Sequence, residues 1–176
     1  PRPETEITVQ QTCDADIAIE RCNALAGQPL PVSAACYLNG HLTIRLSGME
    51  QGVQAAAASI GGETLESAAR FWQQLREHQL AFFSGEKPLW RLSVPPATAP
   101  LPLEGATLLD WGGAQRWLRS EQAADTIRSI SGSAGGHATL FRGGDPGDEV
   151  FHPLQPQLLA LHQRLKQTFD PAGILN

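Results

Sequence analysis

The stretch that decides the fold is VSAACYLNGHLTIRL, residues 32–46. Apolar and polar side chains alternate on both sides of Asn39-Gly40, which is the pattern of two β-strands joined by a tight turn. A two-residue turn would pair Leu38 with His41. The apolar side chains of the first strand would then share a face with the polar side chains of the second, and a sheet with one buried face resists that register.

A three-residue loop over residues 38–40 removes this conflict, because it pairs Tyr37 with His41. The apolar side chains that then share one face are Val32, Ala34, Cys36, Leu42, Ile44 and Leu46. We therefore predict a hairpin with Gly40 in the left-handed conformation and a G1 bulge. The polar side chains of the opposite face are Tyr37, His41, Thr43 and Arg45. An antiparallel sheet can leave such a face open to water or to a partner.

The rest of the chain alternates between strand and helix patterns. Apolar–polar alternation predicts further strands at residues 5–11, 89–94, 107–111, 115–119 and 137–142. Apolar residues at helical spacing predict helices at residues 15–26, 50–60, 64–79, 121–132 and about 153–170. Residues 95–106 hold four prolines and are expected to form a loop. We expect an α+β fold, with one antiparallel sheet, helices packed on one face, and two ferredoxin-like halves.

Length and composition indicate one domain with a buried core. The chain has 176 residues, 41% of them hydrophobic, and a formal net charge of −5 at pH 7. It contains no apolar run long enough to span a membrane, no block of Lys or Arg for nucleic-acid binding, and no signal peptide. The cysteines number 3 and form no C-x-x-C motif, which argues against a disulfide framework and a zinc site. These features predict a cytoplasmic protein.

The ends of the chain indicate a part of something longer. It begins Pro1-Arg2-Pro3, without an initiator Met, and stops at Asn176 without a polar tail. We expect residues 1–176 to form one domain of a longer protein.

The sequence carries no self-contained enzyme signature. It has no G-x-S-x-G, no Walker A motif, no H-E-x-x-H, and no G-x-G-x-x-G that opens a helix after a strand. Its 5 histidines are scattered, so no metal site is expected. The polar residues expected on the open sheet face are Tyr37, Thr43, Arg45, Arg91, Ser93, Arg116 and His137.

Two interpretations of that polar face remain open. It is either a solvated sheet face or a basic pocket for a small carboxylate. In the second interpretation Arg45 and Arg91 bind the carboxylate, because a guanidinium can hold it through two parallel hydrogen bonds. Tyr37 would then orient the substrate, and His137 would exchange a proton near neutral pH.

Four segments carry a family resemblance. They are FWQQLRE at 71–77, DWGGAQRWL at 110–118, AGGHAT at 134–139 and DPAGILN at 170–176. The last is similar to the D-P-x-x-x-x-N-P-G ending of flavin-linked oxidases of the vanillyl-alcohol oxidase type. The other three resemble the C-terminal half of the FAD-binding subunits of bacterial glycolate oxidases, and this likeness covers most of the chain.

The resemblance implies a cap, or substrate, domain whose open sheet face covers a flavin ring. It implies FAD, held by an N-terminal domain that this chain lacks, and oxidation of glycolate to glyoxylate. Partner subunits would be a flavin-bearing catalytic subunit and an iron–sulfur subunit, which could also hold the protein at a membrane. Within the family pattern, His137 lies where related caps carry a His that faces the flavin. Asn176 matches the terminal Asn that lies near the flavin.

Other functions are compatible with the same sequence. The subunit's own flavin site could relay electrons or be structural, in which case the open face would be an intersubunit surface. The chain could also be a stand-alone ferredoxin-like ligand-binding or regulatory module. If it is a cap domain, we expect the isolated chain to be inactive, because the cofactor carries the redox chemistry.

Overall fold

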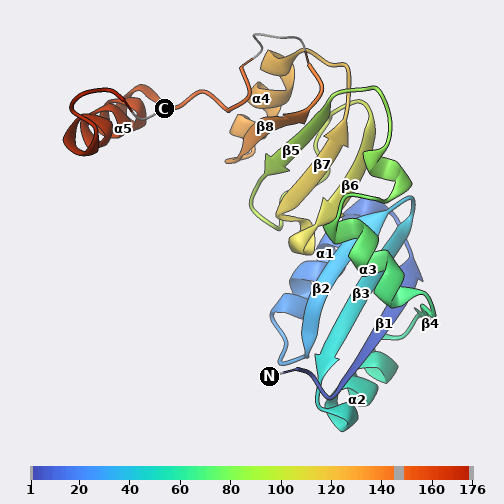
Figure 1. Ribbon diagram of the computed structural model, residues 1–176. Helices are drawn as coiled ribbons and strands as arrows, with labels where there is room; N and C mark the ends of the chain where they lie inside the picture. The colour runs from blue at the N-terminus through green and yellow to red at the C-terminus, as the bar shows by residue number, and fades with distance from the viewer. Residues whose placement is uncertain (1, 145–148, 175–176) are drawn as a thin grey trace.

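A single antiparallel sheet of eight strands organises the protein (Figure 1). The computed structural model describes residues 2–144 and 149–174. The strands are β1 (Thr5–Thr12), β2 (Val32–Leu38), β3 (His41–Gly48), β4 (Glu63–Thr64), β5 (Leu89–Ser93), β6 (Ala106–Asp110), β7 (Gln115–Arg119) and β8 (His137–Arg142). Their order in the sheet is β4-β1-β3-β2-β6-β7-β5-β8. The predicted α+β class is confirmed.

The sheet consists of two ferredoxin-like halves joined edge to edge. In the first half, α1 (Ala15–Ala26) follows β1 and α2 (Glu50–Ile60) follows β3, and the strand order β4-β1-β3-β2 completes a β-α-β-β-α-β unit. In the second half the order β6-β7-β5-β8 repeats this arrangement, with α4 (Ala124–Ser133) before β8. The halves meet where β2 pairs with β6.

The second half replaces its first crossover helix with the proline-rich segment at 94–105. Arg116, only 4% exposed, fastens this segment. Its guanidinium donates to the carbonyl of Ala99 at 2.8 Å, to that of Gly113 at 3.0 Å, and to that of Thr98. Burial lowers the pKa of Arg116. The expectation that Arg116 lies on an open polar face is therefore wrong.

The predicted hairpin register is also wrong. Leu38 pairs with His41 across a two-residue turn, with Asn39 at φ 51° and Gly40 at φ 82°. A bulge between Val32 and Ala34 resolves the conflict at the other end of β2 instead. Gly40 does adopt the left-handed conformation, but the side chains of β2 between the turn and the bulge lie on the opposite faces from those predicted.

Helices lie on both faces of the sheet, and we name each face by one of them. The α1 face is covered by α1, α2 and α4, and its two cores contain Val9, Leu42, Ile44, Val53, Trp90, Leu118, Ile127 and Leu140. On the α3 face, α3 (Ala68–Arg76) and η1 (Ala81–Phe83) cover the middle of the sheet. The core beneath them contains Cys36, Leu75, Phe83, Leu89, Leu108 and Trp117. The α3 face is therefore only partly open.

The last helix, α5 (Pro156–Phe169), lies apart from the sheet (Figure 1). None of its residues is buried, and Leu158, Leu161 and Leu165 are 43%, 43% and 49% exposed. None of the helices within residues 2–144 and 149–174 is both long enough and apolar enough to cross a membrane.

Candidate functional site

The structure separates the predicted site residues. Arg45, Arg91 and His137 lie on the α3 face, as the register of their strands requires. Tyr37 lies on the α1 face, where it packs partly buried against the core beneath α1. Burial is the main cause that raises the pKa of its hydroxyl. Tyr37 therefore does not meet the other three. The two-residue turn pairs Tyr37 with Leu42 and so puts its side chain on the opposite face from the one predicted.

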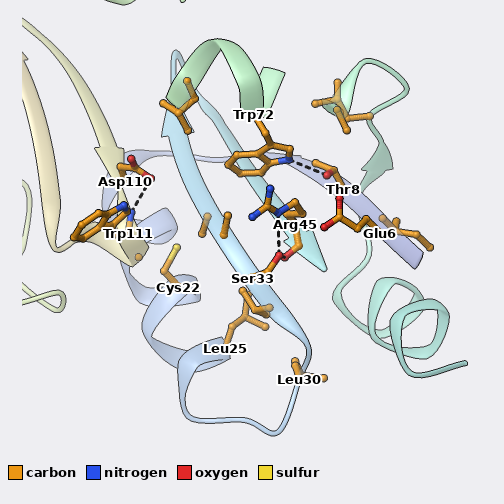
Figure 2. Close-up of a pocket in the computed structure, with 18 of the residues that line it drawn as sticks. Glu6, Thr8, Cys22, Leu25, Leu30, Ser33, Arg45, Trp72, Asp110 and Trp111 are labelled. Atoms are coloured by element: carbon orange, nitrogen blue, oxygen red, sulfur yellow. Dashed lines mark hydrogen bonds between the residues drawn. The ribbon is translucent and has the colours of Figure 1, made fainter. Parts of the chain in front are cut away.

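Arg45 is held in a fixed orientation. Its guanidinium lies over the indole of Trp72, 5.3 Å from the ring centre, and its Nε donates to Ser33 Oγ at 2.9 Å (Figure 2). Ser33 Oγ in turn lies 2.9 Å from Ser47 Oγ, which donates to Glu6 Oε1 at 2.7 Å. Among the described residues, the two terminal amino groups of Arg45 have no hydrogen-bond partner. An arginine fixed in this way is ready to bind a carboxylate.

A groove surrounds Arg45. It has a volume of about 1260 Å³. Its floor is the start of β2, and its walls come from α1 and α3. Trp111, in the 3₁₀ turn η2 (Trp111–Gly113), lines one end of it and is 73% exposed. No sequence pattern indicated this groove, because all the helices were expected on one face of the sheet.

A second group of polar residues lies over β5 and β8. The guanidinium carbons of Arg91 and Arg142 are 6.0 Å and 5.4 Å from the centre of the Phe141 ring. A register irregularity opposite Leu89 brings Phe141 and Arg142 to the same face of β8. Neither arginine forms an ion pair with any described residue. Sequence reasoning missed Arg142, because strict alternation assigns it to the opposite face from Phe141.

Aromatic rings support this arginine pair. The His78 ring lies 4.8 Å from that of Trp117 and 5.3 Å from that of Phe141. Its Nδ1 is 3.4 Å from a terminal nitrogen of Arg142. Burial, and then the charge of Arg142, lower the pKa of His78. A neutral His78 can therefore accept a hydrogen bond from Arg142 and help to hold it in place.

His137 is exposed at the start of β8, beside Ser93 of β5. Arg91 pairs with Thr139, so His137 is the diagonal neighbour of Arg91 on the adjacent strand. The Cα atoms of such diagonal neighbours are about 7–8 Å apart. Its neighbour His152 accepts a hydrogen bond at Nδ1 from the backbone N–H of Ala138, at 3.4 Å. A small substrate can span Arg91 and His137.

Arg45 is too far away to join them. Three strands, β2, β6 and β7, separate its strand from that of Arg91. Four strand spacings amount to about 19 Å, which is farther than a small carboxylate can reach. Asn176 lies outside the described residues. Within the described ranges, no group of three or more His, Cys, Asp or Glu side chains could hold a metal ion.

The whole chain is similar to the glycolate oxidase subunit GlcE of Escherichia coli (strain K12). The two are 45% identical over 176 residues, which is 100% of this chain and 49% of the relative. The chain thus spans about half the length of the curated relative it matches. No family model matches it, and no solved structure matches it significantly. The predicted resemblance to glycolate oxidase subunits is confirmed along the whole chain.

Proposed function

We propose that residues 1–176 form the cap domain of an FAD-dependent subunit that takes part in the oxidation of glycolate to glyoxylate. The observation that carries this proposal is the 45% identity to GlcE over all 176 residues. GlcE is named a subunit of glycolate oxidase. We therefore place this protein in a complex with a flavin-bearing catalytic subunit and an iron–sulfur subunit, in the cytoplasm or at a membrane surface that those partners reach.

The α3 face has the chemistry that a flavin and an anionic substrate need. The ring of Phe141, a residue that is 37% exposed, lies near the guanidinium groups of Arg91 and Arg142, which have no acidic partners among the described residues. These residues fit a flat flavin ring held by the other part of the protein, with Asn176 as a further contact that the family resemblance implies. Bound FAD supplies the hydride-accepting chemistry that no side chain of this chain supplies.

The side chains of this chain bind the substrate and move a proton. Arg91 binds the glycolate carboxylate through its two terminal nitrogens. His137 accepts the proton of the 2-hydroxyl as the C2 hydride leaves. Arg45 and Tyr37 take no part in this site, because the first is about 19 Å away across four strand spacings and the second is on the other face.

The test is glycolate-dependent dye reduction by the full-length subunit in its complex, with flavin content measured in parallel. His137→Ala is expected to lower kcat by about 100-fold or more with flavin retained. Arg91→Gln is expected to raise KM for glycolate more than it lowers kcat. His41→Ala and Arg70→Gln are matched controls, because both residues are exposed and lie outside this site.

Unchanged kinetics in His137→Ala and Arg91→Gln would contradict these roles. Catalysis would then lie in a partner subunit, and the patch around Phe141 would be an intersubunit surface. A wild-type complex that contains no flavin or does not oxidise glycolate would contradict the proposed function itself.

A further inference from the structure

The groove beside Arg45 is left without a role by the proposed function. Its floor is a strand edge. β6 pairs with β2 only at residues 36–38, so among the described residues Val32–Ala35 have no strand partner on that side. If β6 continued past Asp110, it would also pair with this part of β2. Instead, the 3₁₀ turn η2 directs the chain away into β7. A free strand edge is a template for one more extended segment.

The walls of the groove suit the side chains of such a segment. On one side lie Leu25 of α1 and Leu30 of the loop that follows it, and on the other side lies α3 with Trp72 (Figure 2). Ala69 and Leu75 of α3 also line the groove. Side chains of an added strand point alternately to the two sides, so each wall would receive every second residue. An extended segment therefore fits the groove better than a compact ligand does.

Trp111 marks the end of the groove where β6 turns away. It adopts φ 51°, in the left-handed region that non-glycine residues seldom occupy, and its N–H donates to Asp110 Oδ1 at 2.8 Å. Its side chain is 73% exposed. Exposed tryptophans of this kind are enriched at protein interfaces.

Arg45 adds a charge preference. The hydrogen bond from its Nε to Ser33 Oγ brings the guanidinium to a side chain of β2, in the segment whose outer edge is unpaired (Figure 2). Stacking on Trp72 and this bond fix the side chain, while the terminal amino groups have no partner among the described residues. These terminal amino groups therefore suit a carboxylate on the segment that fills the groove.

We propose that this groove docks an extended segment of a partner subunit, which adds as a strand to the free edge of β2 and places an Asp or Glu side chain against Arg45. This inference rests on the proposed function, which makes the protein one subunit of a complex. Backbone pairing with residues 32–35 supplies affinity, and Arg45 and the apolar walls supply selectivity.

The test uses the full-length protein purified in complex with its glycolate oxidase partner subunits. A photo-crosslinking p-benzoyl-phenylalanine replaces Ala69 in the groove or, as the matched control, Ala58, an exposed alanine of α2 outside it. Position 69, and not position 58, is expected to crosslink to one short segment of a partner subunit that contains Asp or Glu. A crosslink within the same chain, to a second copy, or to no protein overturns the proposal.

Affinity provides an independent readout. Arg45→Gln and Ala69→Arg are each expected to weaken assembly with the partner subunits by tenfold or more, whereas Arg70→Gln and Ala58→Arg are not. Ala69 is exposed, so Ala69→Arg tests the groove even if Arg45→Gln unfolds the protein. Unchanged affinity in Ala69→Arg overturns the docking proposal while glycolate oxidation by the wild-type complex upholds the proposed function. A wild-type protein that assembles with no glycolate oxidase subunit overturns both.

Discussion

Trp72 of α3 donates its indole N–H to the hydroxyl of Thr8 in β1, at 3.0 Å. Thr8 is 3% exposed, so this hydroxyl has little access to water. The bond ties α3 to a strand 64 residues earlier in the chain. The same indole supports the guanidinium of Arg45, and the groove therefore depends on it.

Trp72→Phe is expected to lower the free energy of unfolding by about 1 kcal/mol, because Thr8 loses its partner and remains buried. Chemical denaturation of the protein measures this. In the double variant Trp72→Phe/Thr8→Val both polar groups are gone, so its loss should be smaller than the sum of the two single losses. Additive losses would show that the hydrogen bond contributes nothing.

The buried guanidinium of Arg116 leads to a second prediction. Arg116→Leu leaves the carbonyls of Thr98, Ala99 and Gly113 without their donor, and we expect the free energy of unfolding to fall by about 3 kcal/mol or more. Arg116→Lys should rescue little, because an ammonium cannot reproduce the planar set of donors. Arg70→Leu, on an exposed position of α3, is the control. If Arg116→Leu and Arg116→Lys were each as stable as the wild type, Arg116 would not hold the proline-rich segment in place.

Much of the fold could be predicted from local pattern. Alternation predicted strands at 89–94, 115–119 and 137–142, where the structure has β5, β7 and β8, and the order of elements indicated ferredoxin-like halves. The register of the hairpin at Asn39-Gly40 could not be predicted, because a bulge near Ser33, at the far end of β2, changes which face the side chains of β2 point to. A bulge adds one residue without changing composition, so alternation alone does not reveal it.

The site was predicted less well, for a related reason. Its residues depend on which face each strand presents and on how far apart the strands lie in the sheet. The register error placed Tyr37 beside Arg45, although the two are on opposite faces. Strand order put Arg45 and Arg91 about 19 Å apart. The pair Arg91 and His137 came together because β5 and β8 are neighbours, which no local pattern requires.

His152 should make stability depend on pH. Burial, and then the charges of His137 and Arg128, lower the pKa of His152, while the unfolded chain titrates near about 6.5. The unfolded state therefore binds more protons below that pH. The stability that neutral His152 contributes to the folded state is fully present above a pH of about 6.5 and is lost as the pH falls below that value.

His152→Asn retains an acceptor for the N–H of Ala138 and removes the titrating group. We expect its stability to fall less steeply than that of the wild type between pH 7 and pH 5, in denaturant titrations at each pH. Part of the slope should remain, because the pKa of His78 is also lowered. If the variant lost stability with falling pH as steeply as the wild type does, His152 would have the same pKa in the folded and unfolded states.

Gly136 gives the last prediction, since it precedes His137 and packs against β5. A Cβ at this position would lie 2.1 Å from the carbonyl oxygen of Ser93 and 2.7 Å from Val94 Cγ1. Gly136→Ala should therefore force β8 away from β5 and lower the free energy of unfolding by about 1–3 kcal/mol. Because that shift would move His137, glycolate-dependent turnover by the full-length complex should also fall.

Gly132→Ala is the matched control for Gly136→Ala. Gly132 lies in α4, and a Cβ there meets nothing closer than the His152 ring at 3.7 Å, which is an ordinary contact. Alanine favours a helix over glycine by up to about 1 kcal/mol, so this variant should be as stable as the wild type or more so, with unchanged turnover. If Gly136→Ala behaves in the same way, the approach of β8 to β5 at this point is looser than the structure shows, and His137 does not depend on it for its position.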